Sequence, residues 1–322
     1  MNGLIRKVNI LKNMEERIEI RGCKNREELV RVVELCDKAF DKTPYEYFER
    51  HVLKDKTLSP EDTRILLLND EIISSVQVFP RKMYLKSETI EFCGIGNVAT
   101  LPEKRRLGYA ELVMKDAIDY MNKLNARFSL LTTTINKYYE KFGYRTLTRE
   151  LYTIDDVMPS DQKGIRTFSF NNDFEKVIHI YECYNQNSIG PICRDNNYWI
   201  SQFDFCGEDA ELFLISETDN EIKAYIRAVK ETDKIKLLEF AALSEYSNNF
   251  QMLLQSLASR TGINKFEIFL SESEKEKLNA HNYSKKIDFD LMILFLDNML
   301  NENYETMLMK HNNITFWLSD FF

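Results

Sequence analysis

Proline and glycine are scarce in this chain of 322 residues, which has only 6 prolines and 10 glycines. So few proline and glycine residues exclude a collagen-like or low-complexity chain and leave no Pro-rich or Gly-rich linker. The 6 cysteines stand singly, without a Cys-x-x-Cys pair and without histidine at ligand spacing. We therefore expect reduced, buried thiols in place of a disulfide framework, and we expect no metal site.

Long apolar runs are also missing. The longest one covers 291–296, which is far too short to cross a bilayer. The first 21 residues mix charged and apolar side chains and do not resemble a signal peptide. No basic patch with interleaved aromatic residues is present, which disfavours nucleic acid as a partner. We therefore expect a cytoplasmic protein that binds neither membrane nor nucleic acid.

Charge is distributed unevenly along the chain, whose formal net charge is −8. Residues 1–150 carry 27 Lys and Arg against 23 Asp and Glu, a net charge of +4, whereas 151–322 carry 16 against 28, a net charge of −12. Two interpretations stay open. The acidic surplus is either ordinary solvated surface, or it attracts cations beside a basic half that holds an anion.

The stretch 94–110 contains an apolar strand that breaks into a basic turn and then a long helix. Apolar residues from Leu107 to Leu124 follow the spacing of one helical face, so the turn 105–108 lies at a helix N-terminus. Unpaired backbone N–H groups and the positive end of the helix dipole bind phosphate at such a place. Gly108 lets the phosphate approach a backbone that carries no Cβ. The stretch therefore predicts an anion-binding turn.

Two motifs in this region carry a family resemblance. They are Val98-Ala99-Thr100-x-Pro102 followed by Arg105-x-x-Gly108-x-Ala110, and, about 30 residues later, Tyr139-Glu140-Lys141-Phe142-Gly143. The first resembles motif A of the GNAT acyl-CoA N-acyltransferase superfamily, and the second its Tyr-x-x-x-Gly segment. The first motif alone is unspecific; both in this order, between a strand and an amphipathic helix, favour the family.

The resemblance implies a site for acetyl-CoA as acyl donor. The backbone of Val98 and Thr100 would align the pantetheine arm, and a backbone N–H near Val98 would polarise the thioester oxygen. N–H groups of 105–110 would hold the pyrophosphate. The predicted donor-binding residues are Val98, Ala99, Thr100, Arg105, Arg106, Leu107, Gly108, Tyr109 and Ala110. Without such a ligand, the two arginines would be solvated surface charges.

Tyr139 lies four residues before Gly143, the position of the general acid in the superfamily motif. A tyrosine with a pKa near 10 stays protonated at neutral pH and can protonate a departing thiolate, so we expect Tyr139 to be catalytic. For the base, the candidates are Glu91, the C-terminal carboxylate of Phe322, ordered water, or an amine that is already neutral.

The order of expected elements in the first half is that of the GNAT fold, an α/β fold (α+β with a mixed sheet). Strands are expected at 18–20, 64–68, 72–84, 88–100, 127–132 and 144–154, and helices at 25–40, 45–54, 105–124 and 136–142. The second half runs through the same order again. Its strands are expected at 165–170, 210–216, 221–230, 234–243, 266–270 and 287–296, and its helices at 172–186, 198–203, 246–260 and 272–281, with a loop at 190–191.

The second repeat lacks Arg, Gly and Ala where the phosphate turn would lie and carries Glu245 instead. We therefore expect a GNAT-like domain without an acyl-CoA site. The expected division is a catalytic domain at 1–154, the degenerate domain at 155–300, and a tail at 301–322. A tandem of this kind resembles acyltransferases of the Eis (enhanced intracellular survival) type, although we expect no third domain. In that family a C-terminal carboxylate reaches the active site, which is the basis for naming Phe322.

The leading hypothesis is an N-acetyltransferase that moves an acetyl group from acetyl-CoA to a primary amine of a cationic small molecule or a lysine side chain. The acidic second half favours a cationic acceptor. The alternative is a non-catalytic acyl-CoA-binding protein that acts as a sensor or scaffold. The sequence gives no indication of oligomeric state.

Overall fold

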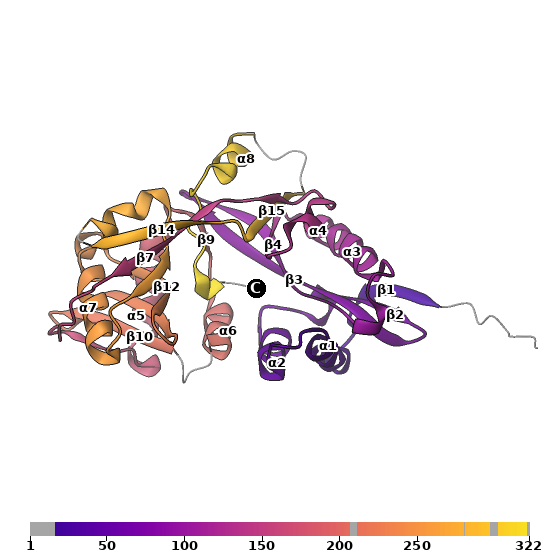
Figure 1. Ribbon diagram of the computed structural model, residues 1–322, viewed down its shortest axis with the longest axis horizontal. Helices are drawn as coiled ribbons and strands as arrows, with labels where there is room; N and C mark the ends of the chain where they lie inside the picture. The colour runs from indigo at the N-terminus through magenta and orange to yellow at the C-terminus, as the bar shows by residue number, and fades with distance from the viewer. Residues whose placement is uncertain (1–16, 207–210, 280, 297–301, 321–322) are drawn as a thin grey trace, which may run out of the picture.

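The structure is a computed structural model that describes residues 17–206, 211–279, 281–296 and 302–320. Within these ranges the strands form two mixed sheets, one of eight strands and one of seven (Figure 1). The expected α/β class, with two halves that are each built on a mixed sheet, is confirmed.

The first sheet comes mainly from the N-terminal half. Its order is β1 (Ile18–Gly22), β2 (Thr63–Leu68), β3 (Glu71–Leu85), β4 (Glu88–Thr100), β5 (Phe128–Thr132), β15 (Leu291–Phe295) and β6 (Arg145–Thr146), with β9 (Ile189–Ile192) paired to β3. The second sheet has the order β14 (Asn282–Asp288), β7 (Arg149–Asp155), β13 (Phe266–Phe269), β12 (Ile235–Ala242), β11 (Glu221–Lys230), β10 (Glu211–Thr218) and β8 (Ile165–Thr167). Both sheets contain a parallel pair, β4–β5 in the first and β12–β13 in the second.

Helices cover both faces of the first sheet (Figure 1). In that view α1 (Arg26–Ala39) and α2 (Tyr45–Leu53) lie below it, and α3 (Tyr109–Lys123) and α4 (Asn136–Glu140) lie above it. The remaining helices are α5 (Phe170–Asn185), α6 (Asn196–Cys206), α7 (Asn249–Thr261) and α8 (Glu302–Met309). Helix α1 begins at the predicted cap, where Asn25 Oδ1 accepts a hydrogen bond from the Glu28 N–H at 3.0 Å. In the described part of the chain, no helix has the length and apolar character needed to cross a membrane.

The two halves exchange strands, which the sequence analysis did not predict. The expected strand 144–154 is divided between β6 in the first sheet and β7 in the second, and the expected strand 287–296 is divided between β14 and β15. The apolar sequence of β15 accounts for its place, because a strand between β5 and β6 is covered on both faces and Leu291, Met292 and Ile293 are fully buried there. The polar β14 is an exposed edge strand instead. The boundary between the two domains, expected near residue 154, stays a prediction.

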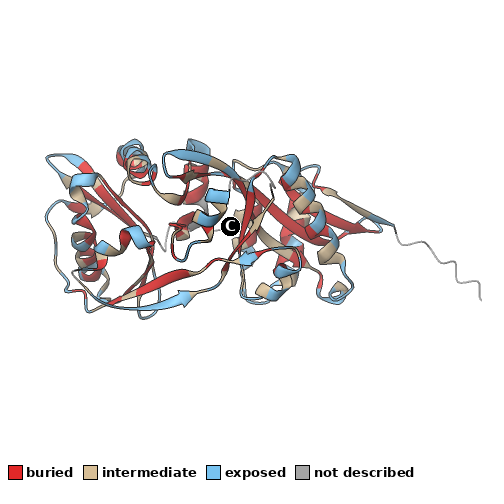
Figure 2. Ribbon diagram, turned by 90° about the horizontal axis from the view of Figure 1, so that it is seen from above, coloured by how far each residue is buried: buried red, intermediate tan, exposed pale blue. Residues whose placement is uncertain are grey.

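Two smaller expectations are corrected. The segment around Gly190, expected to be a loop, forms β9 and pairs with β3 through Met83 and Ile192. The expected helix 272–281 is a 3₁₀ helix, η4 (Glu272–Leu278). Buried residues run through the centre of both halves (Figure 2). The halves also meet beyond the sheets, since α2 packs against α6 and the Lys56 N–H donates to Ser201 Oγ at 2.9 Å.

Candidate active site

A cavity of about 510 Å³ lies where β4 ends and α3 begins. It brings together nearly all the residues that the two motifs singled out. These are Val98, Ala99, Thr100, Arg105, Arg106, Gly108, Tyr109, Ala110 and Tyr139. Leu107, also predicted, is 61% exposed and does not line the cavity. The rest of the wall comes from the end of α1, from helix α4 with its flanking residues, and from both sides of the turn before α3, at Ala39, Phe40, Ile135, Tyr138, Lys141, Lys104 and Glu111.

The cavity opens because β4 and β5 separate. Their parallel pairing runs from Cys93 opposite Ser129 to Ile95 opposite Leu131, and no described pairing joins them beyond that point. The last residues of β4, 96–100, therefore leave one backbone edge without a strand partner on the side of β5. An extended ligand can pair with such an edge, as the resemblance predicted for the pantetheine arm.

The N-terminus of α3 has the geometry of an anion site. Gly108 is its N-cap in the left-handed region, with φ of 86°, and in the described residues no side chain caps this helix end. Among the described residues, no backbone carbonyl accepts a hydrogen bond from the N–H groups of residues 106–110. A Cβ added to Gly108 would meet no heavy atom within 4 Å, so the space before the turn is open. These features fit the diphosphate of coenzyme A.

Arg105 anchors the turn. Its Nη2 donates to the Ala39 carbonyl at 2.6 Å, and its Nε donates to the Thr100 carbonyl at 3.3 Å. The guanidinium therefore joins the end of α1 and the end of β4 to the turn, which is a structural role that the sequence analysis did not foresee. Arg106 is exposed and has φ of 64°. It remains the arginine available to a phosphate.

Tyr139 is only 7% exposed, and burial raises its pKa above the ordinary value of a tyrosine. It therefore keeps its proton at neutral pH. Its ring packs edge-on against Tyr138 and Tyr144, with centroid distances of 4.9 and 6.0 Å. Tyr144 is a packing residue, since it is buried and shares a hydrogen bond of 2.7 Å with Ser129 Oγ.

The hydroxyl of Tyr138 is buried without a hydrogen-bond partner among the described residues. Because Tyr138 lines the cavity, a bound ligand can supply the missing partner. The motif spacing selects Tyr139, and no signal in the sequence points to the hydroxyl of Tyr138. The unsatisfied hydroxyl is a second observation that fits an occupied cavity.

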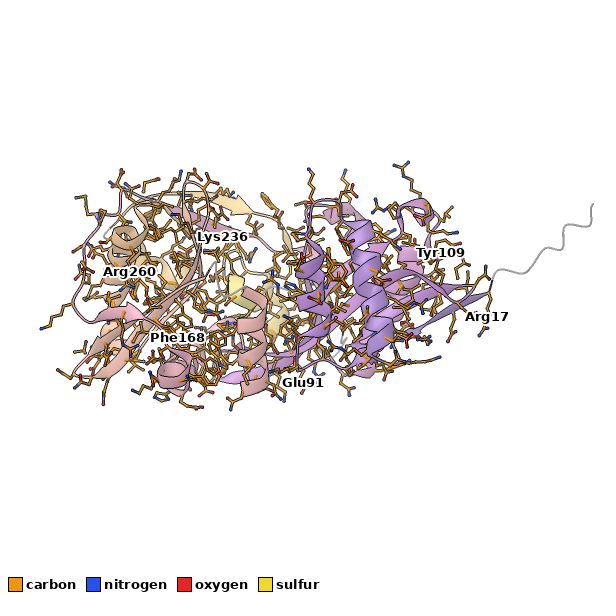
Figure 3. All side chains as sticks on the ribbon, turned by 90° about the horizontal axis from the view of Figure 1, so that it is seen from below. Arg17, Glu91, Tyr109, Phe168, Lys236 and Arg260 are labelled. Carbon is orange, nitrogen blue, oxygen red and sulfur yellow. The ribbon has the colours of Figure 1, made fainter. Side chains whose placement is uncertain are left out.

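The structure does not bring Glu91 to Tyr139. Glu91 forms an ion pair with Lys82 at 3.3 Å and lines a different cavity of about 640 Å³. Figure 3 shows Glu91 toward the junction of the two halves and Tyr109 farther from that junction. Phe322, the other candidate base, lies outside the described residues.

A known family matches the segment of the chain that lines this cavity. Residues 19–147 match the family model of the Acetyltransferase (GNAT) domain. Residues 19–147 are a GNAT acetyltransferase domain. The matched segment includes the phosphate turn, the open edge of β4, and Tyr139. No curated protein matches the chain.

Solved structures share the GNAT-type fold over most of the chain. A GCN5-related N-acetyltransferase from Anabaena variabilis has a TM-score of 0.68 at 15% identity, with 87% of this chain and 73% of that chain covered. Eis1 from Mycobacterium abscessus has a TM-score of 0.64 at 15% identity, with 87% and 74% covered. N-myristoyltransferase from Saccharomyces cerevisiae, solved with bound myristoyl-CoA, has a TM-score of 0.59 at 11% identity, with 93% and 84% covered. These likenesses extend the GNAT-type fold beyond the matched domain.

Proposed function

We propose that this protein is a cytoplasmic N-acetyltransferase that transfers an acetyl group from acetyl-CoA to a primary amine by direct attack in a ternary complex. The observation that carries the proposal is the cavity that joins the uncapped N-terminus of α3, the open edge of β4 and the buried Tyr139. Acetyl-CoA would supply the activated acyl group.

The chain's own residues would bind and orient the donor. The N–H groups of 106–110 would hold the pyrophosphate, with Arg106 adding positive charge, whereas the Arg105 N–H, expected to take part, donates to the Pro102 carbonyl at 3.3 Å. The open edge of β4 at Val98 and Thr100 would align the pantetheine arm and place a backbone N–H near the thioester oxygen. Tyr139 would donate its proton to the sulfur as the thiolate departs, and the proton that the attacking amine loses as it becomes an amide would restore the tyrosine.

For the acceptor, we propose a cationic small molecule or a lysine side chain. Helix α2 and the second half are adjacent, and the net charge of −12 on residues 151–322 would raise the local concentration of a cation near the donor. Exposed charges are screened beyond about 8 Å at physiological ionic strength. Added salt should therefore lower kcat/KM for the true acceptor while kcat stays nearly constant.

The test is release of free thiol from acetyl-CoA in the presence of aminoglycosides, polyamines, amino sugars or lysine peptides. Turnover with a cationic amine that falls with added salt supports the proposal. Stoichiometric binding of coenzyme A without thiol release for any amine would favour the alternative, a non-catalytic acyl-CoA sensor or scaffold. Parallel assays with longer acyl-CoA donors test the assignment of acetyl, because one structural neighbour was solved with myristoyl-CoA.

A further inference from the structure

Strand β4 carries a bulge beside the cavity. Ser75 of β3 lies opposite Ala99 and Gln77 lies opposite Gly96, so two residues of β4, 97 and 98, face a single residue of β3. Asn97 accommodates the extra residue by adopting the left-handed backbone conformation, with φ of 48°. The bulge therefore decides how the backbone of Val98, which lines the cavity, is presented to a ligand.

The side chain of Gln77 stabilises this bulge through hydrogen bonds. Its side chain is 1% exposed and is hydrogen-bonded at both ends of the amide. Asn97 Nδ2 donates to Gln77 Oε1 at 2.6 Å, and Gln77 Nε2 donates to the His51 carbonyl at 3.1 Å. A buried amide with donor and acceptor both engaged has one orientation, and it fixes the side chain of Asn97.

Two serines of β3 support the same turn. Ser74 Oγ donates to the Ala99 carbonyl at 2.8 Å, and Ser75 Oγ donates to the Asn97 carbonyl at 3.4 Å. Both serines are fully buried. The sequence Ser-Ser-x-Gln at 74–77 interrupts the otherwise apolar run 72–79 and is the signal in the sequence for this network.

The His51 carbonyl belongs to the last turn of α2, where carbonyl groups have no partner within the helix. Gln77 therefore caps α2 with one end of its amide and holds the β4 bulge with the other. Beyond α2, the Lys56 N–H donates to Ser201 of α6. A single side chain thus joins the bulge to the helix that contacts the second half.

We propose that Gln77 is a positioning residue for the transfer reaction, which acts through Asn97 to set the backbone of Val98 against the thioester. The inference rests on the proposed function for the identity of the ligand. Gln77 lies outside both sequence motifs. Because it also binds the end of α2, a movement of that helix can change the position of the thioester.

The first experiment compares Gln77→Met with Gln255→Met. Methionine keeps the length of the side chain and removes both hydrogen bonds. Gln255 is a matched control, because its Oε1 accepts from Gln162 Nε2 at 2.8 Å in the second half, so the change removes a similar bond away from the cavity. Thiol release gives kcat and KM, calorimetry gives the Kd of coenzyme A, and thermal melting confirms that each variant is folded at the assay temperature.

We expect Gln77→Met to lower kcat about 10- to 100-fold, because a misplacement near 1 Å at the reacting group has an effect of that order. The Kd of coenzyme A should stay within about threefold, because the phosphate turn is separate from the bulge. Gln255→Met should keep the wild-type kcat. A wild-type kcat in folded Gln77→Met, or equal losses in the two variants, overturns the proposal.

A second readout needs no acceptor. The carbonyl carbon of bound [1-¹³C]acetyl-CoA should resonate downfield of the free donor in wild type and in Gln255→Met, and return toward the free value in Gln77→Met. No displacement in wild type, or an unchanged displacement in Gln77→Met, contradicts the role of the bulge. If no amine releases thiol from wild type, the proposed function fails, and the ¹³C measurement still decides the role of Gln77.

Asn97 provides a variant pair that tests the same point at a less buried position. Glycine adopts positive φ at no steric cost and alanine does not, so Asn97→Gly should lose less kcat than Asn97→Ala. The opposite order would show that the left-handed conformation is not what the network maintains.

Discussion

Gly108 offers a quantitative test of the phosphate site through Gly108→Ala and Gly108→Glu. Its φ of 86° is unfavourable for any residue with a Cβ, so each variant should lose about 1–2 kcal/mol of folding free energy. The alanine methyl group meets no heavy atom within 4 Å and adds no clash. For a chain of this size, each kcal/mol corresponds to about 2–4 °C in Tm, so both variants should melt a few degrees below wild type.

The difference in affinity for coenzyme A between the two variants measures the effect of the added carboxylate charge. A carboxylate about 5 Å from a bound diphosphate repels each unit charge by about 0.8 kcal/mol in a water-like dielectric. Two unit charges then weaken binding about 15-fold, since about 1.4 kcal/mol is a factor of ten. We therefore expect Gly108→Glu to bind coenzyme A about 15-fold more weakly than Gly108→Ala at low salt. The gap should shrink with added salt, because the Debye length falls from about 30 Å at 0.01 M to about 8 Å at 0.15 M.

The assay is titration calorimetry with coenzyme A, with pantetheine as the ligand that lacks the diphosphate. Pantetheine should not distinguish the two variants, because the added carboxylate then has no phosphate to repel. Equal affinity of both variants for coenzyme A, or an equal loss for pantetheine, would refute the placement of the diphosphate at this turn.

Three further predictions concern catalysis, stoichiometry and acid stability. Tyr139→Phe keeps the ring and removes the proton donor, so kcat should fall by about 10²–10⁴ with little change in the Kd of coenzyme A; a wild-type kcat would leave Tyr139 as a packing residue. Because burial raises the pKa of Tyr139, kcat should not decline between pH 7 and 9, and a decline there would assign the proton donor to another group. Calorimetry should give one coenzyme A per chain, since α7 is preceded by 244–248 without the arginine and glycine of the phosphate turn, and a value near two would contradict a degenerate second half. Although burial alone would raise the pKa of Glu150, hydrogen bonds from Lys285, Tyr152 and His311 lower it to about 2. The resulting stability is present above the ordinary glutamate pKa of about 4.3 and is lost as the pH falls toward 2, so Glu150→Gln should flatten the decline of Tm between pH 5 and 3; parallel Tm curves would show that the pairing is not stabilising.

The sequence by itself determined the local units of the site. The strand predicted at 88–100 coincides with β4, and the helix N-terminus predicted after 105–108 is that of α3. These features are readable because their signals are local. A strand, a turn with one obligatory glycine, and an apolar stripe all act between residues close in sequence. Most of the predicted donor-binding residues therefore lie on one continuous stretch.

Only the tertiary structure decided which distant segments join that stretch. The exchange of β7 and β15 between the sheets follows from burial of β15 on both faces, a property of its neighbours. The separation of Glu91 on β4 from Tyr139 on α4 follows from the places of these two elements in the fold, and the spacing of residue types does not reveal it. The hydrogen bonds of Gln77 join residues 20 and 26 positions away in sequence. A buried amide takes whatever partners the packed chain brings within reach, so no local pattern names them in advance.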